Sequence, residues 1–214
     1  MQNRLDERKK RIVNSARRLF NQYGFDGVSI DRIMAGAGLT RGAFYTHFSS
    51  KSDLYADVVT CFFNTPGATN QWPGVRLDLE ARDASAQIIR AYLSRQHADA
   101  VETACPMVAL PTDVARSGAV AKRAFENAFR AMVDRLETPR RAHGPVPRAK
   151  HHAANRTAAL SIAALCIGGM VTARAIEDRG LSDELREACA SVALTLQKRA
   201  RSRTVKRRTR TRPN

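Results

Sequence analysis

Apolar residues near the start of the chain recur at helical spacing, with charged residues between them. Their positions return every three or four residues, which places them on one face of a helix. The positions are Leu5, Ile12, Ala16, Leu19, Phe20 and Tyr23. Gly24 follows immediately, and glycine is common just after a helix C-terminus. The pattern predicts an amphipathic first helix that ends before Gly24.

Short helices separated by glycine follow. Ser29 is a good N-cap for SIDRIMAGA, and Gly36 and Gly38 mark the next break. Thr40 can cap a third helix, RGAFYTHF, and a fourth, KSDLYADVVTCFF, starts at Ser50 or Ser52. Three helices joined by tight turns within residues 1–50 are typical of a helix-turn-helix unit.

The remainder of the chain also has helical periodicity. A Pro/Gly/Asn-rich connector covers 65–75, and helices are predicted over 81–98, 111–136, 149–178 and 183–200. Breaks are expected at 105–106, 138–147 and 180–182. The sequence of residues 138–150 predicts a mobile loop. Residues 201–214 contain almost nothing apolar, which predicts a disordered basic tail. Because no strand-like alternation occurs, the expected fold class is all-α.

Composition narrows the class of protein. Apolar residues make up 43% of the chain, which is enough for a packed core. The longest apolar run, 158–173, is shorter than the roughly 20 residues of a spanning helix, so it predicts a buried helix. The N-terminus lacks the apolar stretch of a secretory signal. Reduced cysteines in a cytoplasm are therefore expected for Cys61, Cys105, Cys166 and Cys189.

Positive charge is concentrated at the two ends of the chain. Residues 1–51 carry ten Lys/Arg and four Asp/Glu, residues 52–197 carry seventeen and sixteen, and residues 198–214 carry nine and none. Clustered positive charge favours a polyanionic partner, most often nucleic acid. A solvated tail on an ordinary soluble protein is the alternative, and charge alone leaves both open.

Residues 38–54, GLTRGAFYTHFSSKSDL, carry the candidate chemistry. On a helix, Phe44 and Phe48 share one face and can pack inward with Leu39. The other side then presents small, polar and basic groups: Arg41, Gly42, Tyr45 and Thr46, flanked by Ala43 and His47. Arginine can bond bidentately to guanine, and Tyr, Thr and His can donate to phosphates. Lys51 follows, where a cation can reach a phosphate.

These residues resemble the DNA-binding domain of the tetracycline-repressor (TetR) family. The similarity covers residues 27–59 and the helix before them, and includes helix lengths, glycines, the Tyr-x-His-Phe run and the following Lys. The resemblance implies that the base-facing positions are Arg41, Gly42 and Ala43. It implies that the phosphate-facing positions are Ser29, Thr40, Tyr45, Thr46, His47 and Lys51. Many family members have Lys or Ser in place of Arg41, so no base preference is carried over.

The resemblance also implies a homodimer with an all-α regulatory and dimerisation domain, whose last two long helices pair with their twins. On this basis we expect a helix-turn-helix domain at 1–50, a ligand-binding and dimerisation domain at 51–200 and the tail at 201–214. A pocket for a small effector that releases DNA is expected in the second domain. Its candidate residues are Cys105, Met107, Phe125, Phe129 and Met132.

Four of these five pocket candidates have a simpler structural explanation. Cys105, just before Pro106, could be a redox or electrophile sensor because a helix N-terminus stabilises a thiolate, but a structural or pocket-lining role is favoured. The three residues on one helix could be ordinary core. His151 and His152 have no carboxylate or Cys at ligand spacing, so no metal and no cofactor are expected.

The function expected is a ligand-responsive, sequence-specific transcriptional regulator, a repressor released from its DNA operator by a small molecule. It would act in the cytoplasm, at the nucleoid and away from membranes. The alternative is an architectural nucleoid protein without sequence preference. An enzyme is not expected, because the sequence shows no nucleophile–base pair, no phosphate-binding glycine loop and no metal cluster.

Overall fold

The computed structural model describes the backbone of residues 2–64, 75–78, 81–137 and 149–210, and the side chains of residues 5–60, 75–78, 81–137 and 155–202. Every regular element in those ranges is a helix, as the all-α prediction requires. Most of the expected connector and loop, at 65–75 and 138–150, lies outside the described residues, as do residues 211–214 and the side chains of His151 and His152.

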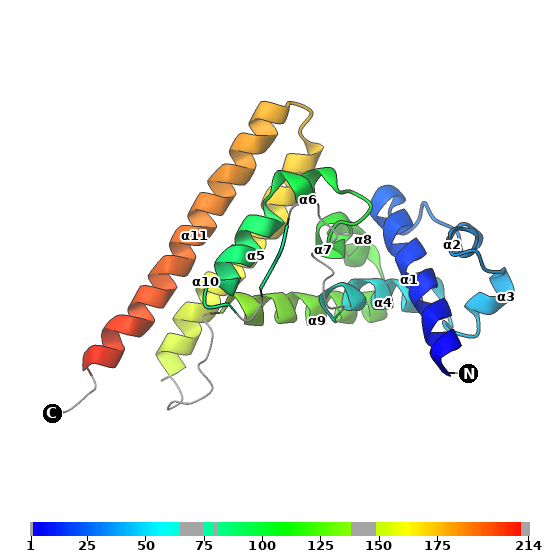
Figure 1. Cartoon of the computed structure of the whole chain (residues 1–214), viewed down its shortest axis with the longest axis horizontal. Helices are drawn as coiled ribbons and strands as arrows, with labels where there is room; N and C mark the ends of the chain where they lie inside the picture. Colours follow the sequence, from blue (N-terminus) through cyan, green and yellow to red (C-terminus); the bar gives the residue numbers. More distant parts are fainter. Residues whose placement is uncertain (1, 65–74, 79–80, 138–148, 211–214) are drawn as a thin grey trace. The chain divides into compact units, whose positions relative to one another are not determined.

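The described part of the chain falls into two compact units (Figure 1). The first combines residues 1–72 with 99–129, and the second combines residues 73–98 with 130–214. The helices of the first unit are α1 (Gln2–Tyr23), α2 (Ile30–Gly36), α3 (Arg41–Phe44), α4 (Lys51–Asn64), α7 (Pro106–Ala109) and α8 (Pro111–Arg116). Helix α9 (Ala119–Leu136) contributes residues to both units.

An aromatic cluster forms the centre of the first unit. The ring of Tyr55 on α4 meets the rings of Phe20 and Phe25, with centroid distances of 5.3 and 4.9 Å. Phe20 and Tyr55 are fully buried. Such edge-on aromatic contacts add to the free energy gained by burying the rings. The cluster fixes α1 against α4 and thereby supports the short helices between them.

Residues 102–113 join this same unit through specific hydrogen bonds. The amide of Asn21 donates to the carbonyl oxygens of Glu102 and Ala104, at 3.2 and 3.0 Å. The carboxylate of Asp113 accepts from the N–H of Phe25 at 2.8 Å. A segment distant in sequence is therefore bonded to the C-terminal end of α1, a relationship that helical periodicity could not reveal.

The second unit is built on a long antiparallel helix pair, α10 (Ala149–Ala175) and α11 (Arg179–Arg210), with α5 (Ala84–Tyr92) packed against both. Gly169 permits the close approach of the pair, since a Cβ there would lie 2.8 Å from the Sγ of Cys189. Arg186 on α11 donates to the carbonyl of Leu93 at 2.9 Å. Arginine suits this place because it satisfies a carbonyl left open at the end of α5.

Two predicted helices are each broken in the structure near a serine residue. The helix expected at 81–98 is split into α5 and α6 (Arg95–Asp99), because the Ser94 hydroxyl donates to the carbonyl of Ala91 and accepts from the N–H of His97. The helix expected at 111–136 breaks before Gly118, where the Ser117 hydroxyl donates to the carbonyl of Asp113. Serine ends helices in this way by competing for main-chain groups.

The C-terminal helix is longer than expected at both ends. It starts at Arg179 because the Asp178 carboxylate accepts from the N–H of Leu181, so the expected break at 180–182 is wrong. It continues to Arg210, where a disordered tail was predicted. Lys and Arg are good helix formers and no glycine or proline interrupts 201–210, so a helix already started can continue without an apolar face.

Candidate DNA-binding surface

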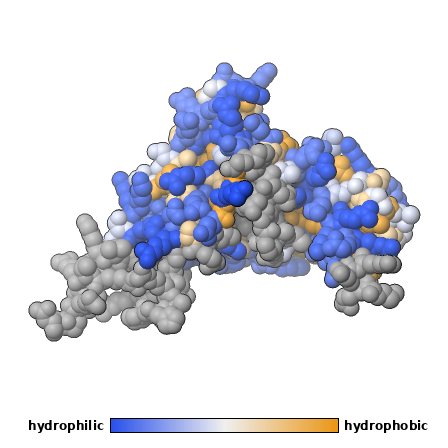
Figure 2. Space-filling view, in the orientation of Figure 1, coloured by the Kyte–Doolittle hydropathy of each residue, from blue (hydrophilic) through white to orange (hydrophobic). Residues whose placement is uncertain are grey.

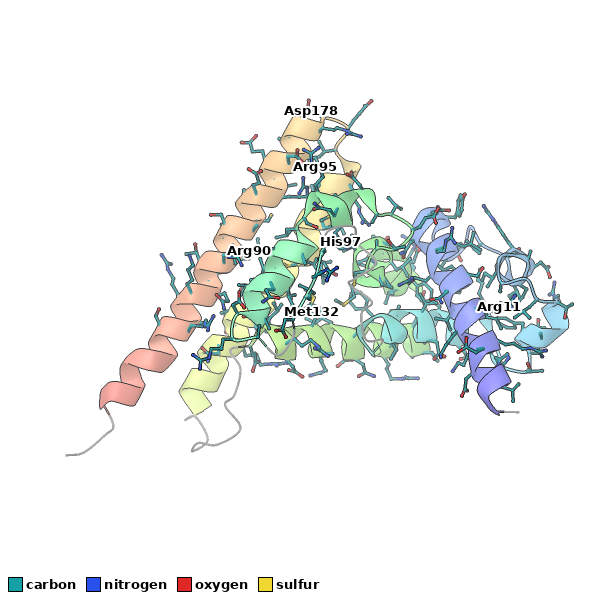
Figure 3. The ribbon with its side chains drawn as sticks, viewed as in Figure 1. Arg11, Arg90, Arg95, His97, Met132 and Asp178 are labelled. Atoms are coloured by element: carbon teal, nitrogen blue, oxygen red, sulfur yellow. The ribbon has the colours of Figure 1, made fainter. Side chains whose placement is uncertain are left out.

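The turn between α2 and α3 is held by contacts from both sides. Ser29 caps α2, its Oγ accepting from the N–H of Arg32 at 3.1 Å, as predicted. Gly38 has a φ of +62°, which favours glycine. Arg11, labelled on α1 in Figure 3, donates to the carbonyl oxygens of Ala37 and Gly38 at 2.5 and 3.3 Å. The sequence did not single out Arg11, although it ties α1 to the turn.

Helix α3 and the turn after it bury the aromatic residues that the pattern assigned to the core. Phe44 is fully buried and Phe48 is 5% exposed, with their ring centroids 5.6 Å apart. Leu39 is half-buried. The regular helix is shorter than the predicted RGAFYTHF, ending at Phe44, and a turn covers 45–47. The prediction of an inward Phe44–Phe48 face is confirmed.

The opposite side of α3 is open. Thr40, Arg41, Gly42, Tyr45 and Thr46 are exposed, and Ala43 is half-buried. A Cβ at Gly42 would meet nothing within 4 Å, so the backbone there is accessible to a large partner. Figure 2 shows that hydrophilic residues cover much of the visible face of the molecule. Of the residues carried over as base-facing, Arg41 and Gly42 are exposed on this surface and Ala43 is half-buried beside them.

Arg41 is held in place by two neighbours on this surface. Its Nη1 lies 2.7 Å from an Oδ2 oxygen of Asp31 on α2, and both side chains are 59% exposed. A hydrogen bond with the side chain of Tyr45, followed by the charge of Asp31, raises the pKa of the Arg41 guanidinium above its usual value. Asp31 is a residue of this surface that the sequence pattern did not indicate. Its place on the outer side of α2, ten residues before Arg41, gave no signal that the two would meet.

Three of the predicted phosphate contacts, at Thr46, His47 and Lys51, have polar atoms that are bonded or buried within the first unit. The Thr46 hydroxyl donates to the carbonyl of Ala43 at 2.8 Å, so it would have to rotate to donate elsewhere. His47 is half-buried, and within the described residues its Nε2 is buried without a hydrogen-bond partner. Lys51 Nζ donates to the carbonyls of Phe25 and Val28 at 2.8 and 3.0 Å. Two of the three ammonium N–H groups of Lys51 therefore bind the α1–α2 loop.

The candidate pocket residues are divided between the two units. Cys105 and Met107 are fully buried in the first unit, and Met132, labelled in Figure 3, is 2% exposed in the second. Phe125 and Phe129 are half-buried with nearly parallel rings, 6.5 Å apart. Burial lowers the pKa of the Arg17 guanidinium in the same unit. These positions fit ordinary core packing, and their binding of a ligand stays a prediction.

Comparison with known proteins shows what the N-terminal domain is similar to. Residues 12–58 match the profile of the bacterial regulatory proteins of the tetR family. Over 52 residues the chain is 44% identical to the HTH-type transcriptional regulator AcrR of Shigella flexneri, a match covering 24% of each chain. Among the first curated relatives, the matched region spans between 24% and 32% of the relative's own length. Sequence similarity therefore covers the N-terminal domain.

Similarity of fold covers most of the chain. A TetR-family transcriptional regulator from Cytophaga hutchinsonii has a TM-score of 0.61 at 18% identity, covering 90% of this chain and 96% of that one. The SmeT–triclosan complex has a TM-score of 0.55 at 22% identity, covering 88% of this chain and 90% of that one. The N-terminal domain of this chain is therefore similar to that of the bacterial regulatory proteins of the tetR family, and the fold of its described residues is similar to that of solved regulators such as these.

Proposed function

We propose that this chain is a sequence-specific DNA-binding regulator of transcription rather than an enzyme. The observation that carries the proposal is the exposed side of α3 and of the turn after it, where Arg41, Gly42 and Tyr45 are exposed while Phe44 is buried on the other side. A short helix with small and basic exposed residues fits the major groove, where arginine discriminates guanine. Thr40 and Tyr45 would position the helix through phosphates. The cytoplasm, at the nucleoid, is the place where such a regulator would act.

We propose that the functional form is a homodimer built on α10 and α11. From residue 160 to 175, every exposed residue of α10 is uncharged; these residues are Leu160, Ser161, Ala164, Gly168, Val171, Thr172 and Ala175. Leu181 and Val192 are each 51% exposed on α11. An uncharged face of this length is typical of helices that pack against a second copy. Two copies would present two α3 helices to two half-sites of one operator.

This same helix satisfies a simple test for a membrane span. Residues 155–175 are long and apolar enough by length and composition to cross a bilayer, which differs from the expectation of a run that is too short. The difference arises because the helix continues beyond the apolar run at both ends, through residues 155–157 and 174–175, which are mostly polar or charged but few enough to leave the span apolar on average. Core helices of soluble proteins pass the same test, and burial of one face against α5 and α11 supports the dimer.

We propose further that a small molecule releases the protein from DNA, so that it acts as a repressor. SmeT, which has a similar fold, was solved as a complex with triclosan. In the present chain, Cys105, Met107, Phe125, Phe129 and Met132 remain the candidate contacts for such an effector. A ligand that binds the DNA-free form more tightly shifts the population away from the operator.

Selection of bound sequences from random duplex DNA tests the proposal. The purified full-length chain should enrich one pseudo-palindromic site. It should bind this site at least about a thousandfold more tightly than random duplex, as specific regulators do. Repetition with candidate effectors should identify a compound that lowers the enriched fraction. An architectural protein would bind with steep salt dependence but enrich no sequence, and that outcome would reject sequence-specific regulation.

A further inference from the structure

The contact between Asp31 and Arg41 joins the two helices of the helix-turn-helix. Asp31 lies in the first turn of α2, and Arg41 is the first residue of α3. Their oxygen and nitrogen are 2.7 Å apart, within the range of a charge-assisted hydrogen bond. Both side chains are more than half exposed, so neither is needed to fill the core. The pair lies on the surface proposed to meet DNA.

The geometry leaves Arg41 able to bind a base while it is held. A guanidinium has five N–H donors in a planar fork; Asp31 engages Nη1 and the side chain of Tyr45 engages a further donor, which leaves three. A bidentate contact to guanine needs two donors on one edge of that fork. An arginine held by a carboxylate also has fewer conformations to lose on binding, and the planar group is turned in a defined direction.

We propose that Asp31 is a positioning residue that sets base discrimination by orienting Arg41, an inference that depends on the proposed DNA-binding function. The carboxylate is itself repelled by phosphates, so it lowers affinity for DNA in general. Asp31 therefore lowers the affinity for all DNA but increases the difference in affinity between sites with the preferred base pair and sites with another. Specificity is a difference between affinities, and a group that opposes the wrong partners increases it.

The test is a double-mutant cycle of the full-length dimer on three duplexes. Each duplex is titrated at one salt concentration with four proteins, and the affinities are compared. The proteins are the wild type, Asp31→Ala, Arg41→Ala and the double variant. The first duplex carries the site enriched by selection. The second carries the same site with one base pair changed, the pair at which Arg41→Ala loses discrimination. The third has a random sequence. Thermal unfolding of each variant shows whether the fold is retained. Asp26→Ala is the control, because it removes one exposed carboxylate from the same unit at a residue outside the Arg41–Asp31 pair.

Asp31→Ala should lower discrimination between the first two duplexes about two- to fivefold, the range of an exposed ion pair. Its affinity for random duplex should rise. In the Arg41→Ala background the same change should leave discrimination unaltered. Asp31→Asn keeps an acceptor for Arg41 without the charge, so it should retain most of the discrimination and still bind random duplex more tightly. Asp26→Ala should leave the discrimination at the wild-type ratio.

Two results would overturn the positioning role. If a folded Asp31→Ala variant keeps the wild-type discrimination, the ion pair is a surface contact with no effect on the choice of base. An equal loss in both backgrounds would mean that Asp31 reads a base directly, as carboxylates can by accepting from the cytosine amino group. A wild-type chain that enriches no sequence would instead reject the proposed function, and the inference with it. The failures of the two proposals are therefore distinguishable.

Discussion

Lys51 contacts Phe25 twice, through a hydrogen bond to its carbonyl oxygen and through a cation–π contact with its ring. The Nζ atom lies 2.8 Å from the carbonyl oxygen of Phe25 and 4.2 Å from the centroid of the Phe25 ring. The ring in turn belongs to the aromatic cluster with Phe20 and Tyr55. Lys51 thus fixes the loop that leads into α2, in addition to the phosphate contact predicted from the sequence.

Lys51→Ala should therefore reduce stability as well as DNA binding. Loss of hydrogen bonds from a charged donor to Phe25 and Val28 should lower the free energy of unfolding by about 1–3 kcal/mol, measured by urea denaturation. Binding to all sequences should weaken alike. If the third N–H of Lys51 contacts phosphate, the salt slope should fall by roughly one. An unchanged slope would assign Lys51 to the loop alone.

Arg41→Ala should abolish discrimination at one base pair while leaving the fold intact. The side chain is 59% exposed and its removal leaves the buried Phe44 untouched. Loss of a bidentate guanine contact should cost about 1–3 kcal/mol on the preferred site and much less on random duplex. Arg123→Ala, at an exposed position on α9, is the matched control. A variant with the wild-type sequence preference would exclude Arg41 as a base-reading residue.

His97 should make the second unit sensitive to acid. It is fully buried, its Nδ1 lies 2.7 Å from the carbonyl oxygen of Tyr92, and burial lowers its pKa from 6.5 to about 3. The unfolded chain binds a proton below pH 6.5 that the folded chain does not. Stability from His97 is thus complete above pH 6.5 and should fall by about 1.4 kcal/mol per pH unit as the pH drops toward 3.

Urea denaturation at pH 7.5, 6 and 5 measures this slope in wild type and in His97→Gln. In His97→Gln the free energy of unfolding should fall less steeply as the pH drops, because the contribution of His97 is removed. His47→Gln, a control at a half-buried histidine of the first unit, should keep the wild-type slope. Equal slopes in wild type and His97→Gln would mean that His97 takes up its proton in the folded state as readily as in the unfolded one.

Sequence patterns predicted the helices of the first unit better than its tertiary contacts. The end of α1 before Gly24, the Ser29 cap and the inward Phe44 each follow from local rules, and the structure agrees at all three. The ion pair of Arg41 with Asp31 and the bonds from Asn21 to residues 102–104 depend on how helices pack, which periodicity does not specify. The breaks at Ser94 and Ser117 were missed because one hydroxyl can override an otherwise continuous apolar pattern.

Ala164→Arg should separate the dimer while leaving each chain folded. Ala164 is exposed at the middle of the uncharged face of α10, so the larger side chain has room within one chain but would place an unpaired charge in the interface. An uncompensated buried charge costs several kcal/mol. Sedimentation should show a monomer with wild-type helix content. Gly169 is unsuitable for this test, since its neighbour Cys189 belongs to the same chain.

Ala164→Ser, which keeps a small uncharged residue, should remain dimeric. Glu187→Arg changes an exposed position of α11 that already carries a charge, and it should also remain dimeric. A stable native dimer of Ala164→Arg would place the interface on another surface of the protein.

Removal of residues 201–214 should leave the fold and the dimer unchanged but weaken nonspecific DNA binding. The truncation deletes seven Lys/Arg residues: Arg201, Arg203, Lys206, Arg207, Arg208, Arg210 and Arg212. If the helical extension of α11 lies against phosphates, affinity for random duplex should fall and the salt slope should shrink by about 0.9 for each lost phosphate contact. The preferred sequence should stay the same, because phosphate contacts carry no sequence information.

A full-length variant with those seven residues changed to glutamine separates charge from chain length. Glutamine forms helices nearly as well as lysine and arginine, so α11 should keep its length through residue 210 while losing the positive charge of residues 201–210. Binding titrations at two salt concentrations, on the selected site and on random duplex, should then give the same smaller slope for the glutamine variant and the truncation. Identical affinities and slopes for all three proteins would leave the tail with a role in solubility only. A changed base preference would mean instead that the extension enters a groove, since only contacts to base edges or groove shape distinguish one sequence from another.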